Sequence, residues 1–352
     1  MARLEAALEH HDLPRGSGPN AGPPALSDQF ADDVVPFLAP GRALVSLVAI
    51  EGSAPRPLGA QMVVAPEGPP GEGIWGYLTG GCLEEAIVTE ARSALRVGVP
   101  RRVRYGAGSP YRDLVLPCGS SIDLYFDVGL TDGVIRALIE ARSERRAIAT
   151  RTDMVGLGSA RIMDQGPIPP AIGSEVRGTR LHDGVLTRVY GPPLQLLMAG
   201  AGPVPLHLAQ LAAGAGLSAR LLTQDQRTAD LAGHLGMPVQ RLTSPRLPVD
   251  LAADAQTAVV VLFHDHDWEP VILEAALATP AFYIGAMGSR RTHAARLDSL
   301  AARGVPADQA ARIIGPVGVT GGARSAPEIA VSILTQILAE ARSRAGAPSV
   351  SG

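Results

Sequence analysis

The chain has 352 residues, a formal net charge of −3, 46% hydrophobic residues and 18% charged residues. This composition excludes a disordered chain, and the length suits about two domains of ~100–200 residues each. The small net charge gives no reason to expect binding to nucleic acid or to an anionic membrane, and no apolar run reaches the ~20 residues of a membrane span.

Basic residues and cysteines narrow the chemistry further. All the basic residues are Arg and none is Lys, which excludes a Lys Schiff base, a P-loop Lys and a catalytic Lys base. The two cysteines, Cys82 and Cys118, are too few for a disulfide scaffold. The N-terminus, interrupted by charges and histidines, does not have the pattern of a secretory signal. We therefore expect a cytoplasmic protein.

The first part of the chain has an α+β pattern. Residues 1–27 are rich in Gly, Pro and Ser and predict a flexible lead-in, followed by an α+β domain over residues 28–143. Hydrophobic periodicity and turn residues predict its elements. The expected helices cover 28–38, 83–98 and 131–143, and the expected strands cover 43–52, 61–65, 101–106, 114–119 and 121–129.

The second part alternates strands and helices. Residues 144–192 are rich in Gly and Pro and predict a connector that carries a hairpin, with short strand candidates at 146–155, 160–164 and 180–191. From 193 to 345 the alternation predicts a Rossmann-like, doubly wound parallel sheet, with a tail at 346–352. The expected strands cover 195–200, 217–225, 258–263, 281–288 and 313–314, and the expected helices cover 204–213, 269–277, 292–303 and 327–342.

A glycine turn follows the first strand of this second domain. Gly200 and Gly202 would let backbone N–H groups approach a phosphate at a helix N-terminus, and Asp225 ends the next strand at about the spacing of a ribose-binding carboxylate. Pro203 and Pro205 have no N–H and occupy the same loop. The fold prediction is thus stronger than the prediction of a bound dinucleotide.

Both cysteines lie in turns. Gly80 and Gly81 precede Cys82 at the start of a helix, where the helix N-terminus favours a thiolate while Glu84 and Glu85 oppose it. From this chemistry alone, a small buried Cys that packs at the helix start is favoured over a reactive thiol. Cys118 lies in a second turn, beside Gly119 and two residues with hydroxyl groups. This setting suits a reactive or metal-binding thiol and a packed thiol equally well.

Two further groups follow strands of the second domain. His264-Asp265-His266-Asp267 has two histidines that suggest a metal site, although a polar loop explains them as well. Arg290 and Arg291 precede a helix and suit a phosphate or a carboxylate, although solvated charges at a helix start are an equal alternative.

Taken together, these segments resemble the XdhC/CoxI family, whose members mature molybdenum hydroxylases such as xanthine dehydrogenase. In the first domain the resemblance rests on EGSAPRPLGAQMVV, GYLTGGCLEEAIVTEA and PCGSSIDLYFD. In the second it rests on LLMAGAGPVPLHLAQLA, LFHDHDWEP, YIGAMGSRRTHAARL and GPVGVTGGARSAPEIAVSIL.

The resemblance implies a molybdenum cofactor (molybdopterin) chaperone that holds the cofactor during sulfuration and inserts it into a xanthine dehydrogenase-type apo-enzyme. The implied partners are that molybdenum hydroxylase and a cysteine desulfurase. The sequence does not decide whether the chain forms a homodimer, although an exposed apolar face on the last helix would allow one. Cys118 and Cys82 would contact molybdenum or its sulfur. The implied cleft residues are Gly80, Gly81 and Arg56 in the first domain and Gly200, Gly202, Arg290 and Asp225 in the second.

Two alternatives stay open. One is an NAD(P)-binding oxidoreductase that uses the Rossmann domain. The other is a scaffold that contacts the hydroxylase and holds no cofactor.

Overall fold

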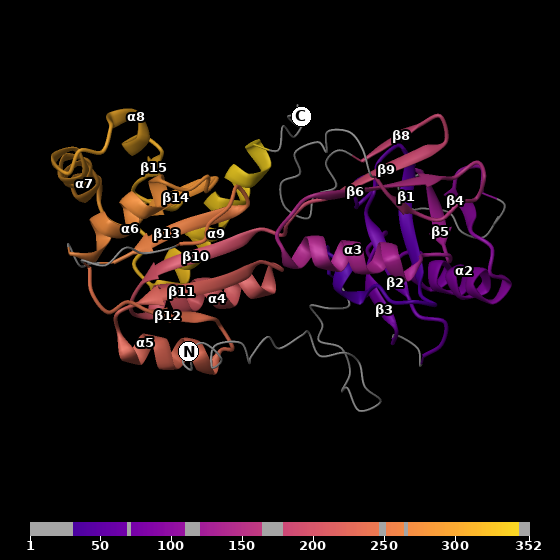
Figure 1. The fold of residues 1–352 in the computed structure, drawn as a ribbon, viewed down its shortest axis with the longest axis horizontal. Helices are drawn as coiled ribbons and strands as arrows, with labels where there is room; N and C mark the ends of the chain where they lie inside the picture. Colours follow the sequence, from indigo (N-terminus) through magenta and orange to yellow (C-terminus); the bar gives the residue numbers. More distant parts are fainter. Residues whose placement is uncertain are drawn as a thin grey trace, which may run out of the picture.

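The computed structural model describes residues 31–68, 72–109, 120–163, 179–245, 251–263 and 267–344. Figure 1 shows two lobes side by side, an N-terminal lobe in indigo to magenta and a C-terminal lobe in orange to yellow. In the described part of the chain, no helix is long and apolar enough to cross a membrane.

The first lobe is built on an antiparallel sheet with the strand order β3-β2-β1-β5-β4. Its elements are β1 (Ala43–Glu51), β2 (Gln61–Val64), β3 (Ile74–Gly76), α2 (Glu84–Val97), β4 (Arg101–Gly106), β5 (Ser121–Asp127) and α3 (Asp132–Ser143). Apart from β3, which the sequence did not predict, these match the expected elements in order and, within a few residues, in extent. The strand expected at 114–119 lies outside the described residues.

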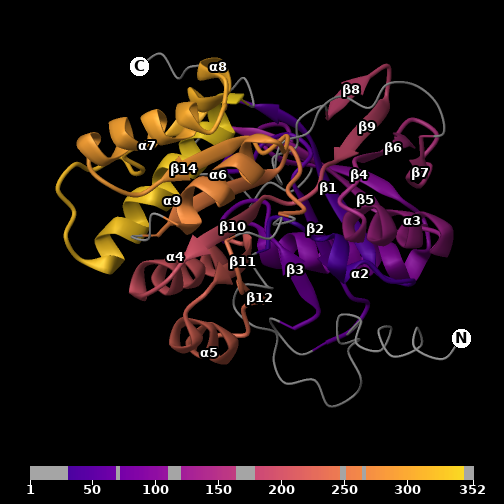
Figure 2. The same cartoon turned by 60° about the vertical axis from the view of Figure 1, so that its left-hand side comes forward.

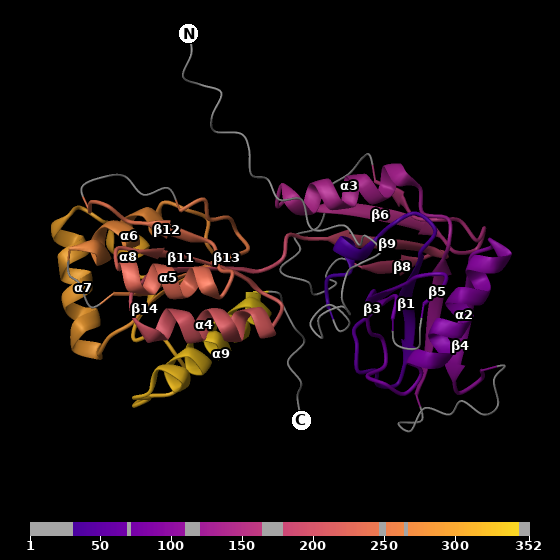
Figure 3. The ribbon, with the colours of Figure 1, turned by 90° about the horizontal axis from the view of Figure 1, so that it is seen from below.

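The two helices of this lobe end and begin where local sequence predicts. Gly98 follows α2 with φ +73°, a left-handed conformation that glycine adopts at low cost. Thr131 precedes α3, and its hydroxyl accepts a hydrogen bond from the Val134 N–H. Figure 3 shows α2 to the right of β1 and α3 above it, so helices cover both faces of the sheet.

The prediction of a helix at 28–38 is wrong for the part of this segment that the structure describes. Only a single 3-10 turn, Val35–Phe37, forms there. Pro36 has no N–H to continue a helical hydrogen-bond pattern, and the Asp33 carboxylate takes the Val35 N–H instead, at 3.1 Å.

A second antiparallel sheet, with the order β7-β6-β9-β8, forms from the segment expected to be a connector. Its strands are β6 (Ile148–Asp153), β7 (Arg161–Ile162), β8 (Arg180–His182) and β9 (Val185–Tyr190). Met154 and Leu186 from this segment form a buried cluster with Val48 and Tyr125 of the first sheet. This segment therefore packs on the first lobe, on the face of the sheet opposite α2.

The second lobe contains a parallel sheet with the order β12-β11-β10-β13-β14-β15. Counted within the lobe this is 3-2-1-4-5-6, the order of a Rossmann fold, which confirms the expected fold class. The strands are β10 (Gln195–Gly200), β11 (Ser218–Thr223), β12 (Val239–Arg241), β13 (Thr257–Leu262), β14 (Tyr283–Ala286) and β15 (Ile313–Ile314).

Helices cover both faces of the parallel sheet. They are α4 (Pro203–Gly214), α5 (Gln226–His234), α6 (Trp268–Leu277), α7 (Arg290–Ala302), α8 (Ala307–Ala310) and α9 (Ala326–Arg344). Helices α4, α5 and α9 share one buried cluster with the sheet, and α6 and α7 share the other. Figure 2 shows α4 and α5 on the opposite side of β10 from α7.

Candidate functional site

The sequence motifs of the first lobe converge on one edge of its sheet. The register pairs Glu51 and Gly106 with Ser121, and Gly76 with Met62. The loops that follow β1, β3 and β4 therefore leave the sheet at the same edge. The first two of these loops carry Arg56 and the Gly80-Gly81-Cys82 turn. The other candidate cysteine, Cys118, lies outside the described residues.

Glu84 organises the turn that carries Cys82. One carboxylate oxygen accepts the Thr79 N–H at 2.7 Å, and the other accepts the Gly81 N–H at 2.7 Å and the Thr79 hydroxyl at 2.6 Å. Longer bonds of 3.3 Å reach the N–H groups of Leu78 and Leu83. Burial opposes ionisation, but these hydrogen bonds outweigh it and keep the pKa of Glu84 below its ordinary value.

This role of Glu84 was missed at the sequence level, where it was considered only as a charge beside the thiol. The signal is its position as the first residue of α2, where a carboxylate can reach back to the N–H groups of the preceding turn.

The turn itself faces open space. Gly80 and Gly81 have φ values of +73° and +108°, and a Cβ at either would meet no atom of the described residues within 4 Å. Cys82, directly after them, is a free and exposed thiol, so the buried, packed cysteine that its chemistry alone favoured is wrong. A ligand can therefore approach the backbone of the turn and the thiol together.

Arg56 connects two of the converging loops. Its guanidinium forms a salt bridge of 2.6 Å with Asp32, donates a hydrogen bond of 3.0 Å to the Tyr77 hydroxyl and lies 4.4 Å from the centre of the Tyr77 ring. Its side chain is only 13% exposed. Arg56 therefore holds the loop after β1 against the loop after β3, and its charge is already compensated.

A polar cluster at the same edge was not expected from the sequence. Arg104 donates hydrogen bonds to Glu51 and to the Ser121 hydroxyl, the latter at 2.6 Å. The hydrogen bond and charge of Arg104 lower the pKa of Glu51. Gly52, with φ +87°, lies so close to Ser120 that a Cβ would be 3.0 Å from the Ser120 Cβ. The end of β1 and the start of β5 are thereby locked together.

In the second lobe, Gly200 and Gly202 lie where β10 meets α4, at the carboxyl edge of the sheet. Gly200 is pressed against β13, since a Cβ there would be 2.8 Å from the Leu262 carbonyl oxygen. Gly202 has φ +88°, and its N–H is used by a hydrogen bond of 2.9 Å to the Thr228 hydroxyl. With Pro203 at the start of α4, few N–H groups of this turn remain for a phosphate.

Asp225 has a structural task in the fold. It is the N-cap of α5, and one carboxylate oxygen accepts the N–H of Thr228 at 2.7 Å and its hydroxyl at 2.6 Å. These hydrogen bonds lower the pKa of Asp225. Asp225, Thr228 and Gly202 thus form a chain that connects the loops after β10 and β11. The sequence pointed to Asp225 as a ribose ligand and did not predict the helix it caps.

Arg290 is exposed on the first turn of α7, which the Ser289 hydroxyl caps by accepting the Thr292 N–H. One turn on, Arg296 is buried and forms a salt bridge of 2.6 Å with Glu269. His264, Asp265 and His266 lie outside the described residues. Within the ranges that the structure describes, no group of three or more His, Cys, Asp or Glu side chains could hold a metal ion.

The candidate residues of the two lobes are not joined to each other by any hydrogen bond among the described residues. The lobes are instead linked by Arg145, which forms a salt bridge of 2.6 Å with Asp254 and donates a hydrogen bond of 3.1 Å to the Pro193 carbonyl. The hydrogen bonds and ion pairs given for Arg56, Gly202 and Asp225 thus stay within their own lobe.

The sequence of this chain is similar to known proteins over most of its length. Residues 40–106 match the profile of the XdhC and CoxI family, and residues 196–337 match that of the XdhC Rossmann domain. The molybdenum cofactor insertion chaperone PaoD of Escherichia coli (strain K12) is 32% identical over 297 residues, which cover 84% of this chain and 82% of PaoD.

Two further matches are more distant. A protein of Bacillus subtilis (strain 168) described as a probable xanthine dehydrogenase subunit is 26% identical over 329 residues, which cover 84% of this chain and 92% of that protein. A crystal structure described as a xanthine dehydrogenase from Bacillus halodurans superimposes with a TM-score of 0.67 at 20% identity, over 88% of this chain and 94% of that one, and so supports the fold. The matched domains and the similarity to PaoD show that this chain belongs to the XdhC/CoxI family.

Proposed function

We propose that this chain is a molybdenum-cofactor chaperone, which holds the cofactor while it is sulfurated and then inserts it into a xanthine dehydrogenase-type hydroxylase. The observation that carries the proposal is the exposed Cys82 thiol on a glycine turn that Glu84 holds open, in a chain 32% identical to the insertion chaperone PaoD. On this proposal the cofactor is cargo, and the partners are the apo-hydroxylase and a cysteine desulfurase, all in the cytoplasm.

The residues of the first-lobe edge fit such a cargo. A soft thiolate is a suitable ligand for molybdenum that already carries dithiolene sulfur. Because Gly80 and Gly81 have no side chains, neither residue blocks a ligand that approaches Cys82 across the turn. We assign metal or sulfur contact to Cys82 and Cys118, and assign to Arg56 the positioning of the two loops.

In the second lobe, Gly200 and Gly202 would shape the turn after β10 without side chains, and Arg290 would supply a positive charge. Arg290 is exposed and suits the phosphate of the pterin. Because Asp225 and the Gly202 N–H are both engaged with Thr228, the NAD(P)-dependent alternative has fewer groups available for a dinucleotide.

The test is co-purification of the cargo. The full chain is expressed in a host that makes molybdenum cofactor, purified anaerobically, and assayed for molybdenum by mass spectrometry and for oxidised pterin by fluorescence. Cys82→Ser and Cys118→Ser are compared with the control Thr89→Ser, an equally small change on the exposed face of α2.

We expect stoichiometric molybdenum and pterin in the wild type and in Thr89→Ser, and their loss in at least one cysteine variant. A wild-type protein that is empty in a host with ample cofactor contradicts the proposal. Stabilisation of that empty protein by NAD(P)H, measured as a thermal shift, would support the oxidoreductase alternative instead.

A further inference from the structure

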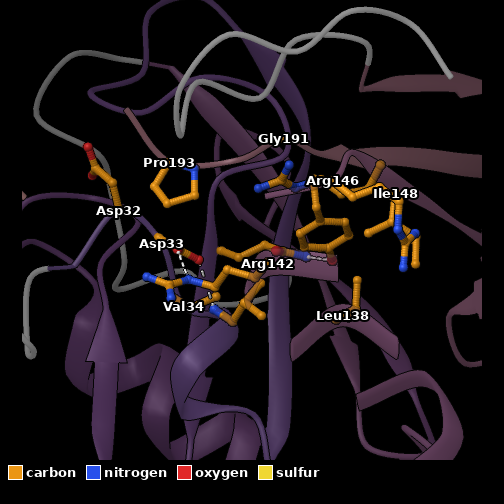
Figure 4. A pocket seen from close by; sticks show the side chains of 13 residues that line it. Asp32, Asp33, Val34, Leu138, Arg142, Arg146, Ile148, Gly191 and Pro193 are labelled. Carbon is orange, nitrogen blue, oxygen red and sulfur yellow. Dashed lines mark hydrogen bonds and ion pairs between the residues drawn. The ribbon is translucent and has the colours of Figure 1, made fainter. Parts of the chain in front are cut away.

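A small cavity lies in the first lobe, apart from the Cys82 turn. It is formed where the chain before β1, helix α3 and strand β9 meet, and Gly191 and Pro193 of the link to the second lobe also border it. Its volume, about 30 Å³ for the centres of water-sized atoms, exceeds the ~10–15 Å³ that one water needs. Figure 4 shows Asp33 and Val34 on one side of it and Arg146 and Ile148 on the other.

Three arginines line this cavity, and one of them is deeply buried. Arg188, on β9, is 7% exposed, whereas Arg142 and Arg146 lie at or just after the end of α3 and are partly or largely exposed. The guanidinium of Arg188 donates a hydrogen bond to the Val189 carbonyl and lies 4.5 Å from the centre of the Tyr190 ring. In the described part of the chain, no carboxylate forms a salt bridge with Arg188, and its Nε has no hydrogen-bond partner.

The carboxylates near the cavity have other partners. Asp33 forms a salt bridge of 2.6 Å with Arg142, and Asp32 forms one of 2.6 Å with Arg56. A guanidinium stays protonated in proteins, and Asp33 attracts the buried Arg188 charge. Because the Asp33 carboxylate already pairs with Arg142, one carboxylate serves two guanidinium groups. Such a charge is costly unless a counter-ion or several hydrogen bonds compensate it.

Gln61 adds a second polar group with spare bonding capacity. Its side-chain amide nitrogen lies 3.0 Å from both the Ser46 and the Tyr190 hydroxyls, while its amide oxygen is buried and has no partner. Both hydroxyls can equally donate to an amide oxygen, so the amide can be turned round without loss of these two bonds. Turned this way, Gln61 offers a buried N–H donor instead of an unpaired acceptor.

From this arrangement we propose that the cavity is a binding site for a phosphate-type oxyanion, held by Arg188 at its base and by Arg146 at its mouth, with Gln61 as a further donor. The anion would compensate the buried charge and bind the two arginines by charge-assisted hydrogen bonds. Arg146 is available for this because its present partner, Glu144, is an exposed neighbour two residues away.

The site is distinct from the surface proposed for the molybdenum cofactor. Gln61 and Tyr190 belong to the face of the first sheet that is covered by α3 and the second sheet, whereas the Cys82 turn leads into α2 on the other face. The proposal therefore does not depend on the chaperone function.

The test is a titration of the purified full chain with inorganic phosphate, at constant ionic strength maintained with KCl, followed by calorimetry and thermal unfolding. We expect phosphate to raise the unfolding temperature by mass action where KCl alone does not. Arg146→Gln should weaken phosphate binding about fivefold. The control Arg136→Gln, an exposed arginine on α3 outside the cavity, should bind like the wild type.

Arg188→Met gives an independent readout. It should abolish the phosphate response and, without phosphate, be at least as stable as the wild type, because it removes a buried charge whose nearby carboxylate, Asp33, is already paired with Arg142. Tighter binding of glycerol 3-phosphate than of inorganic phosphate would assign the site to the phosphate end of a larger ligand, and the reverse order to the free ion. The proposal is overturned if phosphate has no effect beyond that of KCl, or if Arg146→Gln binds phosphate like Arg136→Gln.

Discussion

Replacing Glu84 with Gln preserves the size of the side chain and removes the charge that holds the Cys82 turn. In the wild type, three short hydrogen bonds of 2.6–2.7 Å reach the carboxylate from Thr79 and Gly81. A glutamine has one acceptor oxygen, so the amide nitrogen would face either the Thr79 N–H or the Gly81 N–H. The turn should therefore loosen while helix α2 stays in place.

The magnitude follows from the difference between charged and neutral acceptors. A hydrogen bond to a charged group contributes about 1.5–3 kcal/mol, against ~1 kcal/mol for a neutral pair. The partial exposure of Glu84 weakens these bonds through solvent screening. We therefore expect Glu84→Gln to lower the free energy of unfolding by about 2 kcal/mol in total. For a unit of the size of the first lobe this lowers its unfolding temperature by about 4–8 °C.

The contribution of Glu84 also depends on pH. Since its pKa in the folded chain lies below the ordinary value, the unfolded state binds more protons near that value. The stabilisation is fully present above the ordinary Glu pKa of ~4.3 and is lost as the pH falls through the lowered pKa of the folded state. The free energy of unfolding of the wild type should therefore approach that of Glu84→Gln as the pH is lowered.

The assay is thermal unfolding at neutral and acid pH, together with the molybdenum content after co-expression. Glu85→Gln is the control, because Glu85 is the exposed neighbour on the same helix turn. If Glu84→Gln and Glu85→Gln match in unfolding temperature and cargo content, the carboxylate does not organise the turn and the reasoning is refuted.

Three further predictions concern the second lobe. Gly285→Ala should destabilise it by about 1–3 kcal/mol in urea unfolding, because a Cβ would lie 2.6 Å from the Tyr283 ring. An unchanged free energy of unfolding would contradict this close packing. Arg296→Met should lower the free energy of unfolding by about 3–5 kcal/mol, because it leaves Glu269 buried without its partner. The double variant with Glu269→Gln should recover much of this stability, and a double variant without such recovery would show that the ion pair is not the cause. Asp225→Ala should lower the unfolding temperature by removing the N-cap of α5, whereas Asp225→Asn should restore most of it; loss of stability in both alike would argue against capping.

Local sequence was sufficient for elements whose limits depend on neighbouring residues. Gly98 ends α2 and Thr131 begins α3 through contacts within one turn. The strand-turn-helix pattern around Gly200 similarly predicted the Rossmann-like sheet, because buried parallel strands have a recognisable apolar pattern. By contrast, the helix expected before β1 was wrong because a hydrogen bond from Val35 to Asp33 competes with helical bonding beside Pro36.

Tertiary structure decided what depends on residues far apart in the chain. The sequence by itself determined the two-lobed α/β architecture and its family motifs. It did not show that residues 148–190 pair into a sheet on the first lobe, that Asp225 is engaged by Thr228, or that Arg188 is buried beside Gln61. Periodicity reports which face of an element is apolar, but burial of a particular polar group depends on which other element covers it. Gln61 and Tyr190 are separated by 129 positions, and only the packed fold brings their side chains into contact.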